Sequence, residues 1–193
     1  MKTPHLTFPS DVADKLRQAY QRASVILEYG SGGSTVLAAK LPGKSIYTVE
    51  SDPQWAIKLM EYITAERLPS VPIIHFADIG PTREWGNPVD EKSWKKWSKY
   101  ATSIWSEHSP LSPDVVLVDG RFRVACFLAS ACSIKKPVEI FFDDYIDRTH
   151  YHVVEAIVQP YTMIGRMAIF RVEPGAVKAE DLLRHVDKFY DYG

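Results

Sequence analysis

Residues 25–35 read Val25-Ile26-Leu27-Glu28-Tyr29-Gly30-Ser31-Gly32-Gly33-Ser34-Thr35, an apolar run that ends in a carboxylate and is followed by a turn with three glycines. The run predicts a strand, and the residues after the turn begin a helix. Glycine allows a tight turn and a close approach of a ligand to the backbone. The next apolar run, residues 45–50, ends in Glu50, which is placed to accept hydrogen bonds from a ribose diol. Together these two features indicate a site for a nucleotide-type ligand.

Strand and helix signals alternate through the rest of the chain. We expect helices at residues 11–23, 35–40, 53–66, 121–133 and 147–158, and further strands at residues 71–76, 115–118, 138–142, 161–164 and 167–172. The last two strands flank Gly165-Arg166, a link typical of an antiparallel hairpin. This order predicts an α/β fold with three layers, in which a doubly wound, mostly parallel sheet carries an antiparallel edge strand from the C-terminal hairpin. The ligand crevice should lie at the carboxyl ends of the strands.

The bulk properties limit the kind of protein. A chain of 193 residues can bury one good core but not two full-sized ones, so we expect a single domain spanning residues 1–193. The formal net charge of -1 offers no global field for nucleic acid or an anionic membrane. Neither a secretory signal nor an apolar run of roughly 20 residues is present, which predicts a cytoplasmic protein. Cys126 and Cys132 have no disulfide or metal-ligand pattern and should be reduced core residues.

Two residues argue against a dinucleotide. The third glycine of a G-x-G-x-x-G fingerprint would stand where the chain has Thr35. Glu28, two residues before the first glycine, would repel a pyrophosphate, so a ligand with adenosine and an amine but no phosphate fits better. The motif Glu28-Tyr29-Gly30-Ser31-Gly32 resembles the first motif of the class I S-adenosylmethionine-dependent methyltransferases, and the order of elements from residue 25 to 172 resembles theirs too. The family's third glycine would fall at Ser34, which departs from its pattern.

The resemblance implies S-adenosylmethionine as the cofactor and assigns contacts to it. The glycines would border the methionine part, with Glu28 helping to place its ammonium group. Glu50 would hold the ribose hydroxyls, and Asp78 would accept from the adenine amine while Ile79 packs on the ring. A loop-capping role for Asp78 is an equally good interpretation. The full set of cofactor-binding residues implied in this way is Glu28, Gly30, Ser31, Gly32, Glu50, Ser51, Asp78, Ile79 and Asp119.

Three aspartates follow two central strands. Asp119 ends residues 115–118, and Asp143 and Asp144 end residues 138–142, so all three should meet at one edge of the sheet. Such crowding requires a cation or a proton. The layout resembles the magnesium site of catechol and caffeoyl-coenzyme A O-methyltransferases, with Asp144 in the place of an asparagine, and oxygen ligands suit Mg²⁺. The alternatives are that these aspartates cap the following helices, or that Asp119 or Asp143 orients the acceptor or acts as a general base.

Other charged residues near this edge have two interpretations each. His150 and His152 could furnish a base because histidine titrates near neutrality, although a surface histidine is more often uninvolved. Arg121 and Arg123 could bind an acidic acceptor, or they could pair with neighbouring carboxylates, which is the simpler interpretation.

Residues 79–112 are too long for a simple connection and carry four of the five tryptophans. Trp94 and Trp97 would share a helical face with Ala101, Ile104 and Trp105, while lysines occupy much of the remainder. Interleaved lysines and aromatics can bind single-stranded nucleic acid, but tryptophans at helical spacing more often bury themselves. We therefore interpret this stretch as an insertion that forms a lid and excludes water from the site. Residues 178–192 should form an amphipathic helix that packs on the core or makes a homodimer contact.

The predicted function is S-adenosylmethionine-dependent methyl transfer to a small-molecule acceptor, at a hydroxyl oxygen, with Mg²⁺ as a candidate assistant. One alternative is an NAD(P)-dependent oxidoreductase, which Glu28, Thr35 and the closing hairpin disfavour. Another is a methyltransferase-like binding module without catalysis, for which Ser34 leaves room. The acceptor is not named by the sequence, because insertions rather than the shared scaffold build acceptor pockets.

Overall fold

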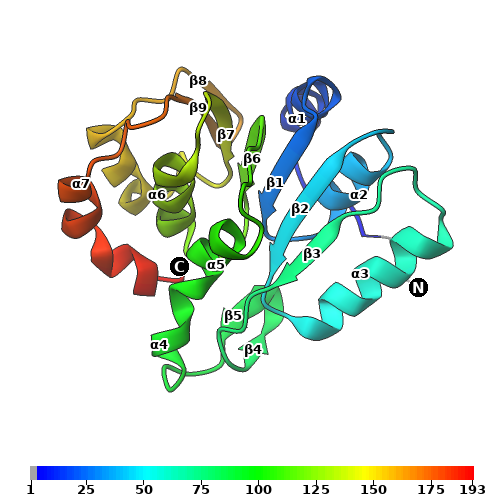
Figure 1. Cartoon of the computed structure of the whole chain (residues 1–193), viewed down its shortest axis with the longest axis horizontal. Coiled ribbons are helices and arrows are strands. Elements are labelled where there is room, and N and C mark those ends of the chain that lie inside the picture. Colours follow the sequence, from blue (N-terminus) through cyan, green and yellow to red (C-terminus); the bar gives the residue numbers. More distant parts are fainter. Residues whose placement is uncertain (1–3) are drawn as a thin grey trace.

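A computed structural model describes residues 4–193 of the chain. Its centre is a seven-stranded sheet (Figure 1). From one edge to the other the strands are β3 (Ile73–Phe76), β2 (Ser45–Glu50), β1 (Val25–Tyr29), β6 (Val115–Val118), β7 (Val138–Phe142), β9 (Met167–Val172) and β8 (Thr162–Ile164). The predicted α/β class is confirmed.

The first five strands of this order are parallel, and the C-terminal hairpin closes the sheet. β9 pairs antiparallel with β7, and β8 pairs antiparallel with β9. The reversed strand is therefore β9, one position inside the edge, while the outermost strand β8 runs in the same direction as the parallel five. This arrangement arises because the second strand of the hairpin, and not the first, pairs with β7.

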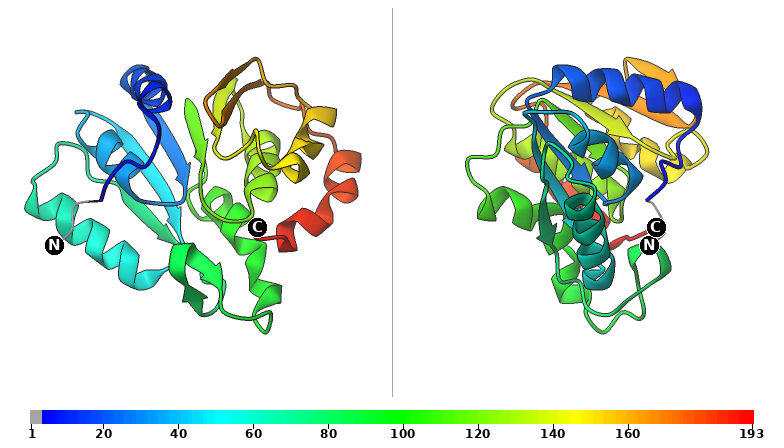
Figure 2. Two further views of the ribbon diagram at one scale, coloured as in Figure 1. Left: turned by 180° about the vertical axis from the view of Figure 1, so that it is seen from behind. Right: turned by 90° about the vertical axis from the view of Figure 1, so that its right-hand side faces the viewer.

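Helices cover both faces of the sheet (Figures 1 and 2). One face packs against α1 (Ser10–Arg22), α2 (Gly33–Ala39) and α3 (Pro53–Ala65), and the other against α5 (Lys99–Glu107), α6 (Arg123–Ser133) and the 3₁₀ helix η2 (Thr149–Ala156). Alternate residues of a strand point to opposite faces. Ile26 of β1 accordingly packs in the first layer, and Leu27 and Tyr29 pack in the second. The apolar-on-both-faces strands predicted from the sequence thus lie at the centre of the three layers.

The stretch interpreted as an insertion divides into two parts. Its second half is α5, which fills the place of the connecting helix between β3 and β6, and its Ala101 and Ile104 are buried. Only the first half adds to the basic plan, with β4 (Thr82–Arg83), the 3₁₀ turn η1 (Glu84–Gly86), β5 (Asn87–Pro88) and α4 (Trp94–Trp97). The added segment is therefore shorter than residues 79–112, because α5 is the helix that connects β3 to β6 in the basic plan.

Two expected helices take a different form. Residues 147–158 contain η2, in which Tyr151 and Val154, three residues apart, are both buried, as the three-residue repeat of a 3₁₀ helix allows. The C-terminal stretch breaks at His185 into α7 (Ala179–Arg184) and the 3₁₀ helix η3 (Val186–Tyr190). It packs on the core as expected, with Tyr192 against Trp97 at a ring distance of 5.3 Å.

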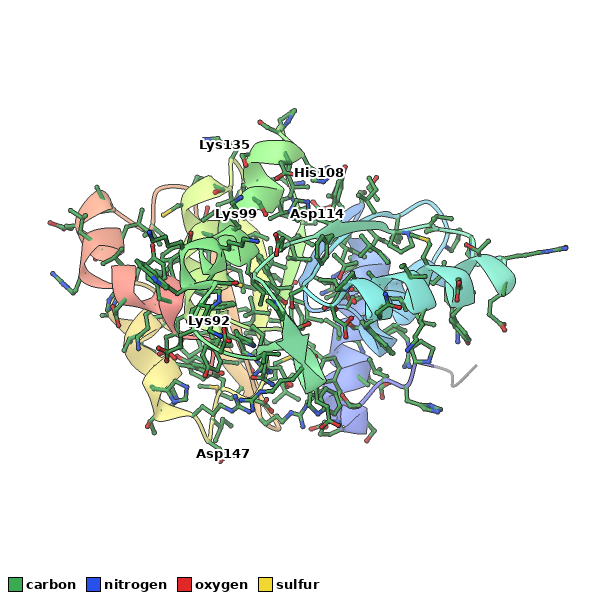
Figure 3. All side chains as sticks on the ribbon, turned by 90° about the horizontal axis from the view of Figure 1, so that it is seen from below. Lys92, Lys99, His108, Asp114, Lys135 and Asp147 are labelled. Carbon is green, nitrogen blue, oxygen red and sulfur yellow. The ribbon has the colours of Figure 1, made fainter. Side chains whose placement is uncertain are left out.

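The two ends of the parallel strands have different roles. At the starting ends, the Asp114 carboxylate accepts from the amides of Ser24 and Val25 at 2.8 and 2.9 Å, which ties β1 to β6. Asp147 follows the far end of β7 and lies on the opposite side of the molecule (Figure 3). The carboxyl ends of β2, β1, β6 and β7 therefore meet at one edge. Within residues 4–193, none of the helices has the length and apolar character needed to cross a membrane.

Candidate active site

A cavity of about 870 Å³ lies at the carboxyl ends of the parallel strands. Segments 4–8, 30–34, 50–52, 85–87 and 119–121 form its wall, together with side chains from beyond the end of β7. It extends from the tip of β2, across β1 and β6, to the neighbourhood of β7. Drug-sized ligands occupy pockets of about 300–1,000 Å³, so the cavity is large enough for a nucleoside with a small second molecule.

Glycine has a different structural role at each of the three positions of the turn. Gly30 has φ +94°, and a Cβ added there would lie 2.9 Å from the Gly120 Cα, so this glycine lets the tips of β1 and β6 meet. A Cβ at Gly33 would lie 2.4 Å from the backbone of His5 and Leu6. A Cβ at Gly32 would meet no atom within 4 Å. Gly32 therefore presents open backbone to the cavity, as a ligand-contacting position requires.

Glu50 lies at the tip of β2 with its carboxylate held in place. One oxygen accepts from the Ser31 hydroxyl at 2.6 Å, and the other accepts from the amides of Ser51 and Asp52 at 2.7 and 2.8 Å. Burial raises the pKa of Glu50 while these hydrogen bonds oppose the rise. Trp55 also donates to the Ser31 carbonyl at 2.9 Å. The tips of β1 and β2 are therefore joined around the Glu50 carboxylate, a hydrogen-bond acceptor that lines the cavity.

Glu28 lies outside the cavity wall, beneath the glycine turn. Strand alternation turns its side chain toward α1 and α2, where it is fully buried. It accepts from the Tyr20 hydroxyl at 2.7 Å and from the Thr35 hydroxyl at 2.6 Å, and Thr35 in turn accepts from the Gly32 amide at 3.0 Å. The Glu28 carboxylate therefore does not reach the cavity in which the family resemblance places a ligand ammonium group. Glu28 fixes the turn through Thr35.

The buried carboxyl of Glu28 makes stability depend on pH. Burial raises its pKa from 4.5 to about 7, against the hydrogen bonds from Thr35 and Tyr20. A raised folded-state pKa contributes stability below the unfolded-state value that is lost as the pH rises through about 7. We expect the melting temperature to fall between about pH 4.5 and 7 and then to level off, and the Glu28→Gln variant to show a clearly smaller fall. Thermal unfolding at several pH values measures this, and equal slopes in both proteins would contradict it.

Asp78 and Ile79 also lie outside the cavity wall. Asp78 accepts from Lys96 Nζ at 2.7 Å and from the Gly80 amide at 2.9 Å, and the Lys96 bond lowers its pKa. Ile79 is buried in the core. Asp78 thus has the loop-capping geometry that was the alternative to an adenine contact, because the chain turns into the added segment directly after it.

The added segment covers the tip of β2. Trp85 is 82% exposed and has φ +64°, a backbone conformation that is strained in a tryptophan. A Cβ at the following Gly86 would lie 2.9 Å from the Ser51 hydroxyl oxygen. The Arg121 Nη1 donates to Asn87 Oδ1 at 3.1 Å. Residues 85–87 are therefore fixed above the strand tips, which fits the predicted lid.

The three predicted aspartates come together, but each is bound by arginine. Asp143 is fully buried and accepts from Arg166 Nη2 at 2.7 Å and Nε at 3.0 Å. Asp144 lies within 3.1 to 3.2 Å of guanidinium nitrogens of Arg123, Arg148 and Arg166. Asp119 lies 3.3 Å from Arg123 Nη2. The positive charge that offsets the repulsion between the three carboxylates is thus supplied by guanidinium groups.

These residues do not fit the magnesium site expected at Asp119, Asp143 and Asp144. A divalent cation needs free carboxylate oxygens directed at one point, and here arginines contact both oxygens of Asp143, both of Asp144 and one of Asp119. No cluster of three histidine, cysteine or acidic side chains within residues 4–193 could hold a metal ion. Arg123 pairs with Asp119 and Asp144, as the simpler interpretation of this arginine expects. Arg166 is not indicated by the sequence, because it reaches Asp143 only through the pairing of β9 with β7.

Asp119 and Asp144 line the cavity, whereas Asp143 does not. The pKa of Asp119 is raised, chiefly by burial and also by the nearby charges of Asp143 and Asp144, while Arg123 opposes the rise. A carboxylate with a raised pKa at a cavity wall is suited to accept a proton. The two candidate histidines lie outside the cavity wall. His150 packs on Tyr151 and His152 stacks on Tyr145, with ring distances of 4.3 and 4.7 Å.

Comparisons with known proteins show what the chain resembles. No family model matches it, and no curated protein is similar enough to count as a match. A crystal structure of a methyltransferase-like protein from Silicibacter pomeroyi shares 45% sequence identity over 98% of both chains, with a TM-score of 0.92.

Two more distant structures share the fold. An O-methyltransferase from Bacillus cereus in complex with S-adenosylhomocysteine is 18% identical, with a TM-score of 0.59, over 88% of this chain and 83% of that one. The O-methyltransferase TomG from Streptomyces achromogenes, in complex with S-adenosylmethionine, is 13% identical, with a TM-score of 0.52, over 84% of this chain and 81% of that one. The chain therefore belongs to the methyltransferase-like proteins, and its fold is that of the class I S-adenosylmethionine-dependent methyltransferases.

Proposed function

We propose that this protein transfers a methyl group from S-adenosylmethionine to a hydroxyl oxygen of a small-molecule acceptor. The observation that carries the proposal is a single cavity that runs from the Glu50 carboxylate, past the open backbone of Gly32, to the Asp119 carboxylate. The complexes of the related folds with S-adenosylhomocysteine and S-adenosylmethionine support this choice of donor.

The wall of the cavity suits the parts of the donor in turn. Glu50 would accept from the ribose hydroxyls, in place of the bond that it receives from Ser31. The turn at Gly30 and Gly32 would border the methionine part, with the reactive methyl directed toward Asp119. Residues 85–87 would cover the donor and exclude water from the reaction.

The chemistry then needs alignment and one base. The acceptor oxygen attacks the methyl carbon in line with the carbon–sulfur bond, so that a carbon–oxygen bond forms as the carbon–sulfur bond breaks. The Asp119 carboxylate takes the hydroxyl proton, and the products are a methyl ether and S-adenosylhomocysteine. Asp143 would act indirectly, because it is buried and held by Arg166. No step passes through a metal ion, in keeping with the arginine-bound carboxylates.

Donor binding is tested most sharply at Gly32. A methyl group added there meets no protein atom within 4 Å, and Gly32 lines the cavity. We expect Gly32→Ala to keep its melting temperature and to bind S-adenosylhomocysteine at least about tenfold more weakly by calorimetry. The matched control is Gly193→Ala, since its added methyl is equally free of contacts but lies away from the cavity. Unchanged affinity in Gly32→Ala would contradict the donor site.

The two alternatives have distinct signatures in the same experiments. An oxidoreductase would be stabilised against thermal unfolding by NADH and not by S-adenosylhomocysteine. A binding module without catalysis would bind S-adenosylhomocysteine but form none of it from S-adenosylmethionine with any acceptor.

A further inference from the structure

Four arginines surround the end of the cavity next to β6 and β7. Arg121, Arg123, Arg148 and Arg166 all contribute to its wall. Three of them form ion pairs with the aspartates described above. Arg121 forms no ion pair with a carboxylate of residues 4–193 and has a single side-chain hydrogen bond, to Asn87. The cavity wall at this end therefore holds four guanidinium groups and the carboxyl groups of Asp119 and Asp144.

Arg121 is half-buried and lacks an anionic partner among the described residues. Its Nε is buried, and no group in the described part of the chain accepts a hydrogen bond from it. Burial lowers the pKa of Arg121, and the neighbouring charge of Arg123 lowers it further. Enclosing a charged group without a counter-charge costs free energy that an ion pair would recover. The surroundings of Arg121 are thus incomplete without an anion.

The nearby carboxylates of the protein are already engaged. Glu50 accepts from Ser31 and from two backbone amides. Asp119 and Asp144 pair with Arg123, and Asp144 also pairs with Arg148 and Arg166. None of these carboxylates pairs with Arg121, so a bound anion is the group that would supply its counter-charge.

The position of Arg121 indicates which molecule this is. Arg121 follows Asp119 by two residues, on the loop that leads into α6, and its side chain extends to residues 86 and 87: Nη1 donates to Asn87 Oδ1, and a Cβ at Gly86 would lie 3.9 Å from its Cγ. In the proposed function the donor's ribose lies at Glu50 and its methionine part lies at the glycine turn. The space next to Asp119 is then left to the acceptor.

We propose that the methyl acceptor carries an anionic group, a carboxylate or a phosphate, that pairs with the guanidinium of Arg121. This inference rests on the proposed function and narrows its substrate class to anionic hydroxyl compounds. A guanidinium can donate two parallel hydrogen bonds to either anion, so it fixes the orientation of the acceptor as well as its charge. The hydroxyl to be methylated is thereby directed toward Asp119.

The test measures binding of small probes to the full chain saturated with S-adenosylhomocysteine. The probes are 4-hydroxybenzoate, 4-hydroxyphenyl phosphate and the neutral 4-hydroxybenzamide, each at up to about 10 mM. We expect at least one anionic probe to bind about tenfold or more tightly than the neutral one, and Arg121→Gln to abolish this preference while Arg121→Lys keeps part of it. The stronger of the two anionic probes identifies the anion.

Several outcomes would overturn the inference. These are equal affinities for all probes, no binding of any probe, or a preference that persists in Arg121→Gln. Arg121→Gln should leave the affinity for S-adenosylhomocysteine within about threefold, because a larger loss would assign the guanidinium to the donor's own carboxylate. If the unmodified protein binds no S-adenosylhomocysteine at all, it is the proposed function that fails.

Two variants serve as controls. Asn87→Ala removes the hydrogen bond between Arg121 and the lid, and it should retain the preference for anions, since the inference assigns that preference to the guanidinium. Loss of the preference in Asn87→Ala with full retention in Arg121→Gln would assign it to the lid instead. Arg171→Gln removes an exposed arginine that pairs with Glu173 on the surface, and it should behave as the unmodified protein.

Discussion

Asp119→Asn is expected to lower the kcat of methyl transfer by about 10²- to 10⁴-fold, because asparagine keeps the shape of the side chain but cannot accept the acceptor's proton. The affinity for S-adenosylhomocysteine should change by less than about threefold, since the carboxylate acts on the acceptor rather than on the donor. Formation of S-adenosylhomocysteine, measured with the tightest-binding hydroxylated probe, gives kcat, and calorimetry gives the affinity.

The pH dependence separates a base from a merely structural carboxylate. The ionised form of Asp119 accepts the proton, so activity should rise as the pH rises through its raised pKa. The residual activity of Asp119→Asn should not show this rise with pH. Asp147→Asn, which changes an exposed carboxylate, is the control and should keep both the kcat and the rise of activity with pH. An Asp119→Asn variant with a nearly normal kcat would remove Asp119 from the mechanism.

Gly30→Ala is expected to lower the free energy of unfolding by about 3 kcal/mol or to prevent folding. The alanine would have to adopt φ +94°, and its Cβ would lie 2.9 Å from both Cα and N of Gly120. Backbone atoms at the junction of two central strands cannot move aside cheaply, so steric strain adds to the conformational strain. Chemical denaturation with urea measures the change.

Gly43→Ala provides the matched comparison for this prediction. Gly43 also has a positive φ, of +71°, but a Cβ there would meet nothing within 4 Å. Its substitution should cost only the conformational part, about 1 kcal/mol. The difference between the two variants measures how closely β1 and β6 approach each other, and equal losses would show that the strand tips are free to separate.

The strands were predictable because their sequence signals are local. Residues 25–29, 45–50, 115–118 and 138–142 match β1, β2, β6 and β7 from end to end, since turn residues bound each apolar run. The strand expected from residue 71 begins at Ile73, because Pro72 has no amide hydrogen to donate to a sheet. Parallel order then brings the strand tips to one edge, which is why Gly30, Gly32 and Glu50 were found at the cavity.

The charge arrangement of the site depends on contacts between distant parts of the chain, and the sequence pattern does not contain it. The crowding of three aspartates and the pairing of Arg123 with neighbouring carboxylates were predictable from nearby residues, but the part of Arg166 was not. Arg166 lies in a hairpin link 23 residues after Asp143, and only the register of β9 on β7 places it there. The surroundings of Glu28 and Asp78 also depend on distant contacts, since the Glu28 side chain is engaged by α1 and α2 and the Asp78 side chain by Lys96.

The contact between Gly33 and the backbone of His5 and Leu6 has a consequence for ligand size. In dinucleotide-binding folds, a pyrophosphate rests on the free amides at the start of the helix after the first strand. Here residues 5 and 6 cross directly over the first residue of α2, at 2.4 Å from where its Cβ would stand. A diphosphate bridge would have to displace this crossing segment before it could reach the helix. The chain itself thus covers the Gly33 position, where an NAD-type molecule would place its diphosphate, whereas a donor without phosphates has no use for that position.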